Sequence, residues 1–160
     1  MPKNNPNKTN VMRILDQAHV SYQIGDYQAS GAISADEAAH AMGQPETHVF
    51  KTLVTVGSSG EHYVFVVPAC ASLDLKKAAA AVGEKSVEMI KSKQLLPLTG
   101  YIHGGCSPIG MKKFFTTTFD RSAQALHAVW FSAGKIGFMV QVAVEDLQTL
   151  IPIAFDDITP

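Results

Sequence analysis

Two apolar runs, Phe50–Val56 and His62–Pro68, stand on either side of the segment Gly57-Ser-Ser-Gly60. Apolar runs of this length, separated by a few turn-forming residues, are typical of a β-hairpin. Few positions in either run are polar, which predicts that both strands are largely buried. A buried antiparallel pair in the middle of the chain argues against a purely parallel, doubly wound sheet.

Helical and strand-like segments surround this hairpin. Apolar residues at helical spacing predict a helix over Val11–His19 with Asn10 as its N-cap, and Ser34-Ala-Asp-Glu37 matches a capping box before a short helix that ends at Gly43. Lys93–Leu98 is ambiguous, because Pro97 must end any helix there. The other expected elements are helices over Leu75–Val82 and Val144–Leu150, and strands over Ser21–Tyr27, Val87–Ile90, Phe114–Phe119, Ala128–Phe131, Phe138–Val142 and Ile153–Asp156. This order predicts an α/β (α+β) fold with a mixed sheet and helices outside it.

The length and composition are those of one globular domain. A chain of 160 residues can bury a sizeable core but is short for two domains, so residues 1–160 are expected to form one domain. The longest apolar stretches, such as Val64–Cys70, are far shorter than the roughly 20 residues of a membrane-spanning helix. Met1–Asn10 is polar and lacks the apolar core of a signal peptide. We therefore expect a cytoplasmic protein that does not bind a membrane.

The metal-binding residue types form no recognisable pattern. Cys70 and Cys106 are far apart in the sequence and belong to no CxxC motif, so both are expected to be free thiols. The six histidines form neither an HxxxH nor an HExxH pattern. We expect no metal site.

The net charge of −1 argues by itself against a dedicated nucleic-acid binder. The charges are unevenly distributed, however, because residues 70–140 carry nine basic and four acidic side chains, whereas residues 141–160 carry four acidic side chains and no basic one. The basic middle segment could face a phosphate backbone, or it could be an ordinary solvated surface.

Lys51 is unusual because it lies where an apolar strand begins, with bulky neighbours on both sides. A lysine in such a strand extends its ammonium group to water, pairs with an acid or points into a cleft. In a cleft, the ammonium group could hold a phosphate or polarise an ester carbonyl.

Two glycine-rich turns follow, over Gly104–Gly110 and Ser132–Gly137. Paired glycines allow backbone N–H groups to approach a ligand closely, although either segment could be a plain turn. Neither contains the GxxxxGK[ST] pattern of a nucleotide-binding loop, and the sequence has no GxSxG motif and no local pair of carboxylates. The residues alone therefore predict a pocket with one lysine and two glycine-rich walls.

Taken together and in this order, these segments resemble the YbaK/EbsC family of transfer-RNA editing domains. The matching segments are Phe50–Val54, Leu73–Ala79, Lys85–Met89, Thr99–Gly110 followed by Lys112 and Lys113, and Ser132–Gly137. The resemblance runs from about residue 11 to residue 157. It implies a mixed, strongly curved sheet flanked by helices. It also implies a hydrolase that deacylates mischarged tRNA, often cysteine on proline tRNA, and binds the acceptor end beside prolyl-tRNA synthetase.

The resemblance also implies roles for individual residues. Lys51 would hold the terminal adenosine or the ester of the substrate, and Tyr27 would be the second catalytic residue. No protein nucleophile and no cofactor are implied, because the thiol of the bound cysteine would attack its own ester and release a cyclic product. The implied substrate-binding residues are Thr52, Gly104, Gly105, Ser132 and Gly134.

Three positions depart from the pattern of cysteine-specific members. Met139 replaces a frequent aspartate, Ser34 replaces a pocket phenylalanine, and Ala133 replaces a glycine. These departures leave two alternatives open. One is a deacylase for another small amino acid such as alanine, and the other is a non-catalytic regulator that binds acyl-tRNA or a nucleotide.

Overall fold

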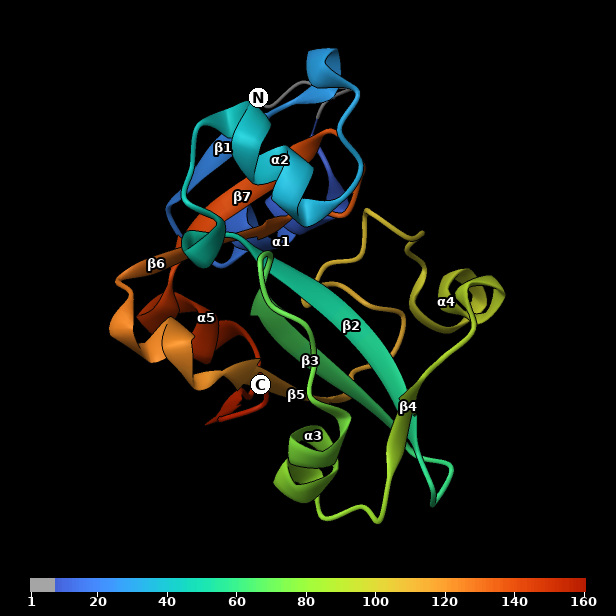
Figure 1. The fold of residues 1–160 in the computed structure, drawn as a ribbon. Coiled ribbons are helices and arrows are strands. Elements are labelled where there is room, and N and C mark those ends of the chain that lie inside the picture. Colours follow the sequence, from blue (N-terminus) through green and yellow to red (C-terminus); the bar gives the residue numbers. More distant parts are fainter. Residues whose placement is uncertain (1–7) are drawn as a thin grey trace.

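The computed structural model describes residues 8–160, which contain five α-helices and eight strands (Figure 1). Residues 1–7, part of the polar N-terminal stretch and of the expected domain 1–160, lie outside the described residues. The helices are α1 (Asn10–Gln17), α2 (Ala35–Met42), α3 (Leu75–Val82), α4 (Ser92–Thr99) and α5 (Val144–Leu150). The strands are β1 (Tyr22–Asp26), β2 (Phe50–Gly57), β3 (His62–Pro68), β4 (Val87–Met89), β5 (Thr116–Asp120), β6 (Ala128–Ser132), β7 (Phe138–Ala143) and β8 (Ala154–Asp156).

The strands form two sheets. Strands β1, β7 and β6 form an antiparallel sheet in that order, and the second sheet has the order β4-β2-β3-β5-β8. In the second sheet, β2 pairs antiparallel with β3 and β4, whereas β5 pairs parallel with β3 and β8. The expected mixed fold is therefore confirmed, with the addition that a parallel bridge between Val49 and Trp130 joins the two sheets.

The predicted hairpin forms as expected. The register from Phe50 opposite Pro68 to Val56 opposite His62 places the turn within Gly57–Gly60. β2 then extends as a long strand from the three-stranded sheet to β4 (Figure 1). Most residues of β3 are buried, because α3 covers one face of this sheet and the central core covers the other.

The helix ends agree with the local sequence signals, with two exceptions. The capping box of Ser34 and Glu37 begins α2, and the left-handed Gly43 ends it. The N-cap of α1 is Thr9, whose hydroxyl accepts the Met12 N–H, and the assignment of that cap to Asn10 is wrong. The prediction that Pro97 ends a helix is also wrong, because α4 continues to Thr99. Pro97 removes only the N–H that would bond to the carbonyl of the exposed Lys93, which water can reach.

Three groups of apolar side chains hold the layers together. The largest lies between the two sheets and includes residues of α1 and α5. The second joins α2 to the three-stranded sheet, and the third joins α3 to the five-stranded sheet. Figure 1 shows α2 over one sheet and α3 over the other, with β2 connecting the two regions.

Candidate functional site

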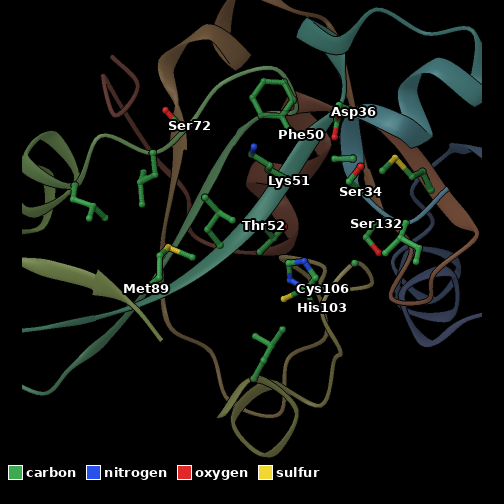
Figure 2. Close-up of a pocket in the computed structure, with 18 residues that line it drawn as sticks. Ser34, Asp36, Phe50, Lys51, Thr52, Ser72, Met89, His103, Cys106 and Ser132 are labelled. Atoms are coloured by element: carbon green, nitrogen blue, oxygen red, sulfur yellow. The ribbon is translucent and has the colours of Figure 1, made fainter. Parts of the chain in front are cut away.

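A cavity of about 460 Å³ opens along the first half of β2, and its lining includes the four consecutive residues Phe50–Leu53 (Figure 2). The segment before α2, the loop after α4, and the facing ends of β6 and β7 complete one part of its wall. The segment before α3, together with β4 and α4, completes the other part. Pockets that enclose a small organic ligand span roughly 300–1,000 Å³. The cavity is therefore large enough to hold a small organic ligand such as a nucleoside ester.

Four of the residues singled out in the sequence meet at this cavity: Lys51 and Thr52 from β2, Gly104 from the loop after α4, and Ser132 from the end of β6. Residues separated by about 80 positions in the chain thus share one site. Ser34 and Met139, the two side-chain departures from the cysteine-specific pattern, also line the cavity.

Gly105 and Gly134 are not part of the cavity lining. A Cβ atom added to Gly105 would lie 3.3 Å from the backbone nitrogen of Ile136, so the first glycine-rich segment packs directly on the second. A Cβ atom added to Gly134 would lie 3.0 Å from the ring of Tyr101. Both glycines allow close packing behind the cavity.

Tyr27 is also outside the cavity lining. It is buried in the cluster that contains Trp130 and Met139, and Met139 itself lines the cavity. The Tyr27 hydroxyl is buried without a hydrogen-bond partner among the described residues. Burial raises the pKa of this phenol, so the hydroxyl is neutral near neutral pH.

Lys51 points into the cavity, and Figure 2 shows its ammonium group between Ser72 on one side and Asp36 on the other. Its Nζ atom lies 3.4 Å from the carbonyl oxygen of Ala69, and it forms no ion pair with any of residues 8–160. Of the explanations left open by the sequence, the structure favours a cleft. A lysine without a carboxylate partner remains free to bind an anionic or ester oxygen.

Asp36 is a cavity residue that the sequence reasoning missed. Its position in the first turn of α2 resembled an ordinary helix-capping pattern, so no signal distinguished it. The pKa of its carboxyl is lowered, mainly by a hydrogen bond with the Ser34 side chain and least by the charge of Lys51. A carboxylate and an ammonium group thus line the same cavity without forming an ion pair with each other.

Polar and apolar side chains both line the cavity. Figure 2 shows Ser34, Asp36 and Ser132 on one side, Lys51 and Thr52 in the middle, and Ser72 and Met89 on the opposite side. The apolar lining residues could not be distinguished from core residues in the sequence, and they include Leu53, Leu73, Leu75, Met89 and Leu95. A ligand with a polar and an apolar part would match this mixed lining.

Cys106 lines the cavity but is a poor nucleophile. Its side chain is buried, and burial raises the pKa of the thiol to about 12. The thiolate, which is the reactive form, is therefore almost absent at neutral pH. Cys70, by contrast, is exposed at the surface.

We expect Cys106→Ala to retain deacylation activity, because burial keeps the thiol protonated at neutral pH. We also expect iodoacetamide to alkylate Cys70 before Cys106 in the folded protein, which intact-mass and peptide mass spectrometry would measure. Melting curves would control for loss of the buried sulfur atom. If Cys106→Ala were inactive with its melting temperature unchanged, a protein thiol would be the nucleophile.

No group of three or more His, Cys, Asp or Glu side chains within residues 8–160 is arranged to hold a metal ion. In the same part of the chain, none of the helices has the length and apolar character needed to cross a membrane.

Comparison with known proteins gives concordant results. The family profile described as aminoacyl-tRNA editing domain matches residues 29–150. EbsC of Enterococcus faecalis, described as a candidate Cys-tRNA(Pro)/Cys-tRNA(Cys) deacylase, is 44% identical over 158 residues, covering 98% of this chain and 96% of EbsC. The solved structure of a candidate trans-editing enzyme for prolyl tRNA synthetase superposes with a TM-score of 0.83 at 26% identity, covering 99% of both chains. The hypothetical protein APE2540 shares the fold, with a TM-score of 0.85 at 20% identity over 94% of this chain and 99% of that one.

Proposed function

Because the chain belongs to the aminoacyl-tRNA editing domain family, we propose that it removes cysteine from mischarged proline tRNA. It is a hydrolase of mischarged aminoacyl-tRNA. The observation that carries the proposal is the ammonium group of Lys51, which forms no ion pair within residues 8–160 and lies in a cavity large enough for an aminoacylated nucleoside. The similarity to EbsC, whose description includes Cys-tRNA(Pro), supports cysteine as the amino acid that is removed.

The proposed mechanism uses the thiol of the substrate. The cysteinyl sulfur attacks the ester carbonyl carbon, a carbon–sulfur bond forms, and the bond to the ribose oxygen breaks. The thiol proton passes to the leaving ribose oxygen, so the products are a cyclic thiolactone and deacylated tRNA. The protein needs only to orient the ester and stabilise the developing oxyanion, for which Lys51 supplies a fixed positive charge. The protonated state of Cys106 agrees with a mechanism without a protein nucleophile.

We place the remaining predicted residues in supporting roles. Thr52, Gly104 and Ser132 would contact the aminoacyl nucleoside, because each lines the cavity. Gly105 and Gly134 would hold the two glycine-rich segments together, and Tyr27 would support the wall at Met139.

The tRNA acceptor end is the proposed partner, and the exposed Lys112 and Lys113 would contact its phosphates. We further propose that the protein acts in the cytoplasm beside prolyl-tRNA synthetase. The fold shared with a candidate trans-editing enzyme for that synthetase supports this partnership.

The test compares proline tRNA charged with cysteine, serine, alanine or S-methylcysteine in single-turnover reactions. We expect cysteine to be released fastest, because serine and alanine lack a thiol and S-methylcysteine has a blocked one. Equal release of cysteine and S-methylcysteine would contradict the substrate-assisted mechanism but not the deacylase activity. Release of none of the four amino acids would contradict the proposed function.

A deacylase for alanine is the second candidate. The apolar Met139 lines the cavity at the position where cysteine-specific members often have an aspartate, and this observation favours an apolar amino acid. The same experiment distinguishes the candidates, because faster release of alanine than of cysteine would support the second one.

A further inference from the structure

The first half of β2 has an uncovered edge. Near its start, Val49 bridges to Trp130 of β6, and near its end, Thr55–Gly57 pair with β4. Between these contacts, Lys51–Leu53 have β3 on one side only, and no other strand of residues 8–160 pairs with them. These residues line the cavity, so the gap between the two sheets lies at the cavity wall.

The direction of the backbone groups in this gap follows from the hydrogen bonds on either side of it. The Val49 carbonyl accepts the Ala69 N–H at 2.7 Å, and the Gly57 N–H donates to the Glu61 carbonyl at 2.8 Å. Odd-numbered residues of β2 thus direct their backbone groups toward β3, because these groups alternate along an antiparallel strand.

The backbone N–H and C=O groups of the even-numbered residues of β2 point away from β3, toward the opposite edge of the strand. The Val54 carbonyl accepts the Ile90 N–H at 3.3 Å, on the β4 side. The N–H and C=O of Thr52 point to the same edge, and no strand of the described chain is there to pair with them. They form a donor and an acceptor, side by side, at the edge of the cavity.

The side chain of Thr52 also carries a hydrogen-bonding group without a partner among the described residues. Its hydroxyl oxygen is buried and has no hydrogen-bond partner among the described residues. Buried polar groups in native proteins are almost always hydrogen-bonded, so an orphan hydroxyl in a cavity wall indicates a polar ligand group.

We infer that the aminoacyl group of the substrate binds Thr52 as though it were one residue of an added antiparallel strand. Its ammonium group donates to the Thr52 carbonyl, and its ester carbonyl accepts the Thr52 N–H. Two residues that face each other in a hydrogen-bonded antiparallel pair exchange these two bonds, and an amino acid ester carries both groups. The inference rests on the proposed function, since it names how the same site holds its substrate.

This binding mode has two chemical consequences. The Thr52 N–H is aimed at the oxygen on which negative charge develops, so it stabilises the oxyanion together with the ammonium group of the adjacent Lys51. Side chains of directly opposed residues project from the same face of a sheet. The side chain of the bound amino acid therefore lies next to the orphan hydroxyl of Thr52, which can bond to a thiol.

The test replaces the amide N–H of Thr52 by an ester oxygen, by incorporating the α-hydroxy analogue of threonine. The matched control is the same replacement at Phe65, whose N–H faces Leu53 within the β2–β3 pair and whose side chain lies outside the cavity. We expect the Thr52 ester to lower single-turnover deacylation of Cys-tRNA(Pro) by at least about tenfold, with a smaller loss of melting temperature than the Phe65 ester. The Phe65 ester should lose stability but keep its rate while folded.

A Thr52 ester with the wild-type rate would overturn the inference, since the N–H would then not contact the ester carbonyl. Thr52→Val provides a separate check, because it removes only the hydroxyl and keeps the backbone donor. We expect this variant to discriminate cysteine from alanine less well than wild type, and unchanged discrimination would contradict the proposed contact with the thiol. Failure of the proposed function is distinguishable, because wild type itself would then release no amino acid.

Discussion

Replacement of Lys51 by alanine is expected to lower single-turnover deacylation of Cys-tRNA(Pro) by at least about tenfold, equivalent to about 1.4 kcal/mol of transition-state stabilisation. The ammonium group points into the cavity and forms no ion pair with a carboxylate among the described residues, so its charge is available to the substrate. The melting temperature should change little, because the side chain is only half-buried and bonds to one carbonyl oxygen, that of Ala69.

Two further substitutions separate charge from shape at this position. Lys51→Met keeps a long apolar stem but removes the charge, so we expect it to be as inactive as Lys51→Ala. Lys51→Arg keeps the charge in a planar, forked group, and we expect it to restore little activity in a fitted cavity. Full activity in Lys51→Ala and Lys51→Met would remove the central element of the proposed mechanism, and a non-catalytic binding protein would then describe the chain better.

Substitution of Gly104 by alanine is expected to reduce both stability and activity. Its φ angle of +89° is one that residues with a Cβ atom rarely adopt, and the added Cβ would lie 2.9 Å from Cγ2 and 3.2 Å from the carbonyl oxygen of Ile33. The backbone strain alone should lower the free energy of unfolding by about 1–3 kcal/mol. Displacement of the cavity wall by as little as about 1 Å could lower the rate roughly 100-fold.

Gly60→Ala is the matched control for this prediction. Gly60 has nearly the same φ angle, +91°, but open space where the Cβ atom would be added, and it lies in the turn at the far end of the hairpin. Chemical denaturation would measure the loss of stability in both variants, and single-turnover kinetics would measure the rates. We expect both variants to lose stability but only Gly104→Ala to lose activity. Equal rates in the two variants would show that Gly104 does not shape the site.

The local elements followed directly from the sequence. The hairpin of β2 and β3, the capping box before α2 and the glycine that ends α3 all depend on residues within one turn or one strand pair. Because these signals involve only residues that are near one another in the chain, almost all of them can be predicted from the sequence. The proline in α4 was misjudged because the penalty for a missing N–H depends on whether water reaches the freed carbonyl.

Only some of the residues that line the site could be predicted from the sequence. Lys51 stood out because a charge in an apolar strand needs an explanation, and the order of the glycine-rich segments resembled a known family. Asp36 gave no such signal, because an acidic residue in the first turn of a helix is ordinary, and Met89 looked like any core residue. Tyr27 was assigned to the substrate by resemblance, and it lies in a buried cluster with Met139 and outside the cavity lining.

By itself, then, the sequence determined the elements, the mixed fold, the family and the lysine at the centre of the site. Only the tertiary structure decided which walls meet, because these depend on how far β6 and β4 extend along β2. Strand pairing depends on two segments that are distant in the chain, so the residue at which the pairing ends cannot be predicted from a local sequence pattern. Within the described chain, the backbone of Thr52 has no strand partner on this edge because β6 and β4 both end before they reach it, so no property of the threonine itself could have revealed it.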